Sequence, residues 1–279
     1  MRVLILGSKG QTGRALEHLS KNFGHETVAL DIGEIDISDR SAVNRVVDEF
    51  HPTHIINAAA YNGVDAAEVE IDEAFSVNAL APAFLALAAQ KAGAIMIHYS
   101  TDYIFDGEKD TDYIEDDIPN PLSVYGRSKL LGEQAVRSIL PEKSYILRTS
   151  WVFGPGGNNF VSRILKLAES RKELSFINDQ LCAPTYAPDL ARVSLELINR
   201  NAPFGIYHAA GCEVLTPFSW AKAILEYDNR PVLLKPVGAD SFKTAARRPK
   251  RAVLSNRKLT DLGINLSGGT SCLQNFFNH

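Results

Sequence analysis

The sequence is poor in cysteine, carries no strong excess of either charge and has no long hydrophobic run. Its 279 residues include only Cys182, Cys212 and Cys272, which form no C-x-x-C pair. An odd number of widely spaced cysteines argues against a disulfide framework and favours a reducing compartment. The net charge of −4 gives no general affinity for nucleic acid or anionic membranes. The apolar run at residues 2–7 is too short for a signal peptide or a membrane span. We therefore expect a cytoplasmic protein with neither nucleic-acid nor membrane partners.

Short apolar runs alternate with longer helical patterns through the first half of the chain. This alternation predicts an α/β fold with a Rossmann-type, doubly wound parallel sheet. The expected strands are nearly continuous apolar runs, typical of strands covered on both faces, at residues 3–6, 27–30, 54–57, 94–99 and 145–147. The expected helices between them lie at residues 11–21, 40–50, 72–92 and 123–138.

The pattern changes near residue 151, and we expect a smaller, substrate-binding lobe from there. Residues 1–150 are predicted to form a dinucleotide-binding domain, with residues 188–212 returning to it. Residues 151–279 would form most of the second lobe. Its expected elements are helices at 159–170 and 189–199, a loop at 178–188 and one more strand of the main sheet at 206–209.

A glycine-rich loop follows the first expected strand and opens the first helix. Glycines at this spacing allow a tight turn and a close approach of the backbone to a pyrophosphate, which the helix N-terminus attracts. The alternative is a plain turn, but the context of strand, loop and helix favours dinucleotide binding. The predicted phosphate-binding residues are Gly7, Lys9, Gly10, Gln11, Thr12 and Gly13.

Asp31 and Lys9 favour different nicotinamide cofactors. Asp31, at the end of the second expected strand, would bond the adenine ribose and repel a 2′-phosphate, which favours NADH. Lys9 would offset that charge and accept NADPH, so both cofactors stay open. Ala58, Ala59 and Ala60 end the third strand, where small side chains leave space for a cofactor or, equally, allow close helix packing.

Tyr125 and Lys129 stand four residues apart in an expected helix, on one face. A nearby ammonium stabilises phenolate and would lower the pKa of the tyrosine toward the working range of a proton donor. The same lysine would hold the nicotinamide ribose. The spacing alone is common on solvated helix faces, and the glycine loop upstream gives it its weight.

Hydroxyl side chains close the fourth strand. Ser100 or Thr101 would bond a substrate carbonyl and orient it toward Tyr125. Carboxyl ends of parallel strands are where α/β sheets bind ligands. The alternative is that this Ser-Thr-Asp segment caps a turn, and we weigh the active-site interpretation above it.

The ordered set of motifs resembles the extended short-chain dehydrogenases/reductases, and most closely the dTDP-4-dehydrorhamnose reductases. The resemblance spans nearly the whole chain. The matching segments lie at residues 7–13, 36–39, 57–61, 64–65, 68, 98–107, 124–129, 148–154, 157–160, 178–180, 183–185 and 248–249.

By this resemblance, Thr101, Tyr125 and Lys129 would be the catalytic trio of a reductase acting on the 4-keto group of a nucleotide-activated deoxysugar. Tyr125 would give a proton to the C4 oxygen while NAD(P)H delivers hydride to C4. Further cofactor contacts would come from Asp36, Ile37, Tyr61, Ser100, Thr149 and Ser150. The sugar nucleotide would meet Asp102, Tyr103, Trp151, Asn159 and Arg248.

Related sugar-nucleotide dehydratases carry Thr-Asp-Glu where this chain has Thr-Asp-Tyr, ending in Tyr103. The second carboxylate needed for elimination is missing, which favours simple reduction. Some relatives hold Mg²⁺ with glutamates at a dimer contact, and here the corresponding position is Ala15. We therefore predict no metal ligands, with Mg²⁺ implied by the family alone, and leave a homodimer open.

Alternatives stay open for the role of one loop and for the function of the whole chain. The basic run at residues 247–251 is either a solvated loop or a partner for the substrate diphosphate, with Arg248 the best candidate. A nucleotide-sugar epimerase or dehydratase would use the same fold and cofactor. A cofactor-binding regulatory subunit of another enzyme is a third hypothesis, against which the intact Thr101, Tyr125 and Lys129 argue.

Overall fold

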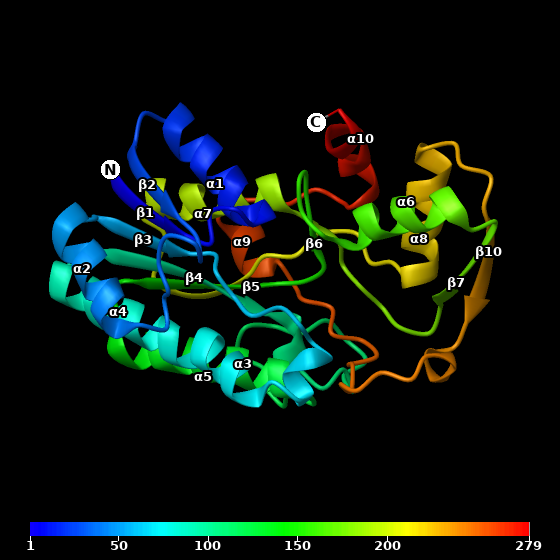
Figure 1. Cartoon of the computed structure of the whole chain (residues 1–279), viewed down its shortest axis with the longest axis horizontal. Coiled ribbons are helices and arrows are strands. Elements are labelled where there is room, and N and C mark those ends of the chain that lie inside the picture. Colours follow the sequence, from blue (N-terminus) through cyan, green and yellow to red (C-terminus); the bar gives the residue numbers. More distant parts are fainter. Residues whose placement is uncertain (279) are drawn as a thin grey trace.

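The computed structural model describes residues 1–278 and contains a six-stranded parallel sheet with helices on both faces (Figure 1). The strand order is β2-β1-β3-β4-β5-β9. The strands are β1 Arg2–Leu6, β2 Glu26–Leu30, β3 His54–Asn57, β4 Ile95–Thr101, β5 Ser144–Thr149 and β9 Gly205–His208. This architecture confirms the predicted Rossmann-type fold.

Both faces of the sheet are apolar because alternate side chains of each strand point to opposite sides. In β1, Val3 and Ile5 join the core under one helical layer, while Leu4 and Leu6 join the core under the other. The first layer contains α1 Gln11–Asn22 and α7 Ala187–Asn199, and the second contains α2 Arg40–Phe50, α4 Ala81–Ala92 and α5 Val124–Ile139. Continuous apolar strands are therefore explained by burial on two sides.

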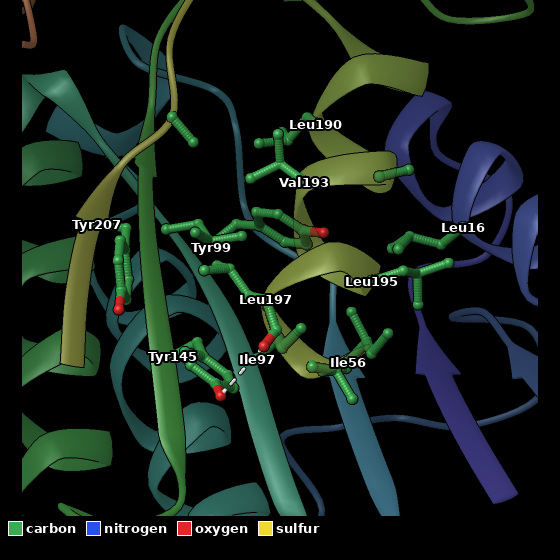
Figure 2. Packing of buried hydrophobic residues seen from close by; sticks show 14 of the residues in the cluster. Leu16, Ile56, Ile97, Tyr99, Tyr145, Leu190, Val193, Leu195, Leu197 and Tyr207 are labelled. Atoms are coloured by element: carbon green, nitrogen blue, oxygen red, sulfur yellow. Dashed lines mark hydrogen bonds between the residues drawn. The ribbon is translucent and has the colours of Figure 1, made fainter. Parts of the chain in front are cut away.

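Tyrosines fill the larger gaps in the core beneath α7 (Figure 2). The ring of Tyr145 is buried, and its hydroxyl donates to the Ala202 carbonyl at 2.7 Å. The hydroxyls of Tyr99 and Ser194 lie 2.6 Å apart, which joins β4 to α7. The phenols of Tyr99 and Tyr145 thus keep polar partners, as a low-dielectric interior favours.

The helix predicted at residues 72–92 is interrupted by one π-helical turn. It runs as α3 Ile71–Phe75, the π turn Ser76–Leu80 and α4. Residues 71–92 are long and apolar enough, by length and composition alone, to cross a membrane. However, 44% of the apolar 18-residue segment within them is buried inside the structure. Its contacts with α2 and α5 make it a core helix of the second layer.

The second lobe has its own core, built around Trp220 and Phe153. A two-stranded parallel sheet pairs β7 with β10, and a second pairs β6 with β8. The sequence did not predict these short strands. The elements of the second lobe are β6 Val152–Phe153, α6 Phe160–Ser170, β7 Glu173–Ile177, β8 Thr185–Tyr186, α8 Pro217–Tyr227, β10 Leu233–Val237 and α10 Leu273–Phe277. The short helix α9 Arg257–Asp261 lies beside β9 of the main sheet.

A buried ion pair joins β5 to α5. The Arg148 guanidinium donates to both carboxylate oxygens of Glu133, at 3.1 and 2.5 Å, and both residues are 2% exposed. Arg148 also donates to the Glu115 carbonyl and lies over the Phe105 ring. Burial and the positive charge of Arg148 lower the pKa of the neighbouring His208 to about 3, so that imidazole stays neutral. The position of α5 is therefore fixed by a pair whose charges are fully satisfied.

We expect Glu133→Leu to lower the free energy of unfolding by about 3–5 kcal/mol, because it leaves the Arg148 charge buried and unpaired. Urea denaturation would measure this loss. Asp48→Ala, which breaks the exposed pair with Lys91, should cost less than about 1 kcal/mol. The double variant with Arg148→Met should recover much of the loss, and no recovery would contradict this account.

Candidate active site

A cavity of about 530 Å³ opens at the carboxyl ends of β1, β3, β4 and β5. The sheet reverses its direction of growth between β1 and β3, which is where doubly wound folds bind ligands. Many of the residues proposed from sequence line this cavity together: Lys9, Gly10, Gln11, Thr12, Ala58, Ala60, Ser100, Thr101, Asp102, Tyr103, Tyr125, Lys129, Thr149, Ser150 and Trp151.

The glycine loop is built for close backbone packing. Gly7 has φ +78°, and a Cβ there would lie 2.5 Å from the Ala59 nitrogen. A Cβ on Gly13 would lie 2.1 Å from the Gly7 carbonyl oxygen. The N-cap of α1 is Gly10, with no side-chain cap. The first N–H groups of α1 are therefore free to bind an anion.

Asp31 is held against the glycine loop. The Lys9 backbone N–H donates to its carboxylate at 2.7 Å. The Lys9 ammonium extends outward, 3.9 Å from the Glu34 carboxylate. The end of β2 thus presents the opposed charges of Asp31 and Lys9 that the sequence indicated, with Glu34 as a second carboxylate.

Two buried hydroxyls in the cavity have no partner within the described residues. Ser100 Oγ ends β4 and Thr149 Oγ1 ends β5, and both lie on the cavity wall. A buried hydroxyl without a partner costs free energy, and such groups are commonly completed by a ligand. The free N-terminus of α1 fits the pyrophosphate of a dinucleotide, and the two hydroxyls fit a polar group at one end of the same ligand.

Tyr125 and Lys129 lie on the buried face of α5, which begins after the Ser123 cap. The Lys129 ammonium donates to the Tyr99 carbonyl at 2.6 Å, and burial lowers the pKa of Lys129 to about 8. Burial raises the pKa of Tyr125 to about 12, and the Thr101 hydroxyl is the group that lowers it. The expected lowering by Lys129 is not seen. Tyr125 is therefore a protonated phenol at neutral pH.

Thr101 and Asp102 close β4 in a tight 3-10 turn. The Thr101 hydroxyl lies 3.0 Å from the Asp102 carboxylate and accepts the Tyr103 backbone N–H at 3.2 Å. Thr101 does cap this turn, so the capping interpretation holds alongside the cavity position. Burial raises the pKa of Asp102 to about 7. The Tyr103 ring meets the Tyr125 ring edge-on, with 5.7 Å between centroids.

The second lobe covers the glycine loop through Gln11. Its amide donates to the Val152 carbonyl at 2.7 Å and accepts from Asn159 at 3.0 Å. Asn159 also caps α6 and donates to the Gly154 carbonyl. Its amide hydrogens are thus used within the protein, on Gln11 of the glycine loop and on carbonyls of its own lobe. Its predicted contact with substrate stays a prediction. Trp151 has φ +47°, a rare backbone state for a bulky residue and one that clusters at binding sites.

A larger cavity of about 1270 Å³ adjoins the first and shares Tyr103 and Trp151 with it. Arg248 lies on its wall, where the guanidinium bonds both Asp65 oxygens at 3.1 and 2.6 Å. The basic run is therefore partly tied down rather than solvated. Other cations on the wall are Arg163, Arg171, Lys243 and Arg247.

Several proposed residues lie outside the first cavity. The Ile37 side chain is buried in the core, the Asp36 carboxylate bonds Ser38, and the Tyr61 hydroxyl bonds Glu70. Their predicted cofactor contacts stay predictions. Among residues 1–278, no group of three or more His, Cys, Asp or Glu side chains is arranged to hold a metal ion.

Asn78, which was not among the residues predicted from the sequence, lies in the π turn and is 1% exposed. Its amide oxygen accepts from the Tyr61 backbone N–H, and its amide nitrogen donates to the Tyr61 carbonyl. The same nitrogen also donates to the Ser128 hydroxyl of α5. It therefore ties the loop after β3 to the helix that carries Tyr125. A single polar residue within the apolar stretch at residues 77–89 was the available signal. The missed cavity residues are Asn62, Val64, Tyr99, Val152, Gly156, Gly157, Asn158 and Leu190.

Comparisons with known proteins agree with this geometry. The family model described as the RmlD substrate binding domain matches residues 1–278. A dTDP-4-dehydrorhamnose reductase of Aggregatibacter actinomycetemcomitans is 40% identical, over 98% of this chain and 97% of its own. A solved dTDP-4-dehydrorhamnose reductase of Clostridium acetobutylicum has TM-score 0.96 at 36% identity, covering 100% and 99% of the chains. One from Bacillus anthracis, solved in complex with NADP, has TM-score 0.95 at 37% identity, covering 99% and 98%.

We expect Gly13→Ala to fold but to bind a nicotinamide dinucleotide at least tenfold more weakly, because its Cβ would push the Gly7 carbonyl out of the loop. Calorimetric titration with NADPH and NADH would measure the change. Gly238→Ala, in the second lobe with a nearest contact of 3.3 Å, should bind both cofactors normally. Equal affinity in the two variants would contradict the role given to the loop.

Proposed function

This chain belongs to the dTDP-4-dehydrorhamnose reductase family, and we propose that it reduces dTDP-4-dehydro-L-rhamnose to dTDP-L-rhamnose with NAD(P)H. The observation that carries the proposal is the placement of the Tyr125 phenol beside the Thr101 hydroxyl in a cavity that also contains the glycine loop. Burial raises the pKa of that phenol to about 12, which keeps its proton in place. Reduction of a ketone needs a proton donor, a group that polarises the carbonyl and a hydride donor.

The cofactor would lie with its pyrophosphate on the N-terminus of α1 and its nicotinamide toward β4 and β5. Ser100 and Thr149 would complete their hydrogen bonding on the nicotinamide end, and Lys129 would hold the ribose. When bound, NAD(P)H supplies the hydride. The relative solved with NADP supports a nicotinamide cofactor. Asp31 and Lys9 oppose each other, so we propose that both NADH and NADPH are accepted.

Tyr125 would donate its proton to the C4 oxygen of the sugar. Its high pKa keeps the proton on the phenol until charge develops on that oxygen. The buried Lys129 ammonium then stabilises the phenolate that forms, since opposite charges attract strongly in a dry site. Thr101 would hold the same oxygen and keep it aligned with Tyr125.

The nucleotide would occupy the larger cavity. Arg163, Arg171, Lys243 and Arg247 on its wall would neutralise the diphosphate. Trp151 and Tyr103 belong to both cavities and would contact the sugar between them. Asp102 is the only carboxylate on the wall of the first cavity, within the described residues, so elimination lacks its acid and base pair.

We propose the remaining features on the same basis. Residues 1–150 with 188–212 would form the dinucleotide-binding unit, and the rest of 151–279 the substrate lobe. The protein would work in the cytoplasm, with a homodimer left open and Mg²⁺ without matched ligands.

The test is loss of nicotinamide absorbance when dTDP-4-dehydro-L-rhamnose, made in place by the enzymes that supply it, is added with NADPH or NADH. The proposal expects substrate-dependent oxidation and dTDP-L-rhamnose as product. Cofactor binding without oxidation would overturn it and would favour another keto sugar or a regulatory role. A cofactor that cycles without net oxidation would indicate an epimerase.

We expect Tyr125→Phe to lose about 10²- to 10⁴-fold in kcat, because the ring is kept and only the proton donor is removed. Affinity for NADPH, measured by titration, should change little. Tyr227→Phe, on an exposed tyrosine of α8, should keep wild-type turnover. Near-normal turnover in Tyr125→Phe would show that the proton comes from another group.

A further inference from the structure

We propose that Asp102 is a positioning residue that sets which way the Thr101 hydroxyl donates its single proton. Only with a protonated Asp102 would Thr101 donate to the keto oxygen of the sugar. This inference rests on the proposed function, because it concerns the same cavity and the same reacting oxygen. It adds to that function a protonation state of the enzyme that the catalytic trio alone does not specify.

The hydrogen-bonding capacity of Thr101 limits what this hydroxyl can do for the substrate. A hydroxyl has one proton to donate and two lone pairs to accept with. The Thr101 oxygen lies 3.0 Å from the Asp102 carboxyl and accepts the Tyr103 backbone N–H at 3.2 Å. One lone pair is therefore always in use, and the hydroxyl also lies within hydrogen-bonding reach of Tyr125. The direction of the bond to Asp102 decides whether the remaining capacity of Thr101 is a proton or a lone pair.

An ionised Asp102 only accepts, so Thr101 must donate to it. The free capacity of Thr101 is then a lone pair, which repels the lone pairs of a ketone oxygen. A protonated Asp102 donates instead, which fills the second lone pair of Thr101 and frees its proton. Thr101 can then donate to the C4 oxygen, where negative charge develops during reduction.

The surroundings of Asp102 favour the protonated acid near neutral pH. The residue is 5% exposed, and burial raises its pKa to about 7. Hydrogen bonds from Thr101, Ser150 and the Tyr103 backbone N–H act in the other direction. Within the described residues, no lysine or arginine forms an ion pair with it.

Four other titratable groups face this part of the cavity from neighbouring elements. Tyr103, Tyr125 and Cys182 each have a pKa raised in part by the charge of Asp102. All three stay neutral at physiological pH. Lys129 on α5 has a pKa near 8, and its charged partner is Glu133 rather than Asp102. Lys129 is therefore the one other group whose titration falls close to that of Asp102.

The experiment is kcat for NADPH oxidation with saturating sugar nucleotide, measured from about pH 6 to 9. Wild type should show a plateau at low pH and then lose about tenfold per pH unit above the pKa of Asp102. In Asp102→Asn the amide oxygen can keep the backbone N–H while the amide nitrogen donates to Thr101 at every pH. Its turnover should stay within about tenfold of the wild-type plateau. Its pH profile should lack the decrease in kcat that ionisation of Asp102 causes.

Two further variants keep the test decisive. Thr101→Ala removes the hydroxyl through which Asp102 acts, so its slower turnover should also lose that fall, even if Asp102→Asn does not fold. Asp112→Asn removes an exposed carboxylate, paired with Arg251, and should keep the wild-type profile. Persistence of the wild-type fall in Asp102→Asn or Thr101→Ala would assign it to Lys129 and overturn the proposal. A folded, cofactor-binding Asp102→Asn that is inactive at every pH would do the same.

Failure of the proposed function looks different. Wild type would then oxidise no NADPH with dTDP-4-dehydro-L-rhamnose at any pH, while still binding the cofactor. A wild type that turns over but shows the same pH profile as Asp102→Asn would leave the reductase function intact and remove only the role of Asp102.

Discussion

The site depends on the ion pair between Glu133 and Arg148. Glu133 is eight residues after Tyr125 and four after Lys129, so all three share the buried face of α5. Arg148 belongs to β5, whose end carries Thr149, Ser150 and then Trp151. One bidentate contact therefore aligns the helix that would donate the proton with the strand that would receive the nicotinamide. The pair is weak evidence for overall stability, because desolvation offsets its attraction, but it fixes one register of α5 against the sheet.

The second lobe is joined to this frame by polar contacts and by a small shared apolar cluster, in which Ala183 and Leu254 pack with Phe105. Gln11 reaches across to Val152 and Asn159, and Asp65 reaches to Arg248. The apolar core around Trp220 belongs to the second lobe alone. The hydrogen bonds lie where the cofactor loop meets the substrate wall, at the edges of the two cavities.

Most of the first half of the fold could be predicted from the sequence. The strands at 54–57 and the helix at 40–50 agree with the structure to the residue, because continuous apolar runs and a strong helical pattern leave little ambiguity. The strands β7 and β10 were missed because Lys235 and Pro236 dilute their pattern and their pairing joins segments far apart in the chain. Asn78 was missed because its role arises from a π turn, which local propensity does not reveal.

The candidate site was predictable where a motif has a fixed spacing, as in residues 7–13 and at Tyr125 and Lys129. It was less so where a side chain is used internally. The bond from Asn159 to Gln11 and the pairing of Arg248 with Asp65 depend on contacts across 148 and 183 positions. The pKa of Tyr125 was also misjudged, because the sequence indicates a nearby lysine but not the depth of burial that outweighs it.

The place of β9 at the edge of the sheet has a consequence for biosynthesis. β5 is completed by residues 144–149, but its partner on that side is made only at residues 205–208. A growing chain shorter than that exposes β5 as an apolar edge, the kind of surface on which other strands pair. The same stretch of chain contains α7, which covers one face of the sheet. The ribosome must therefore deliver about three quarters of the polypeptide before the sheet that holds the cofactor is closed at its edge, and chaperone demand should be greatest just before that point.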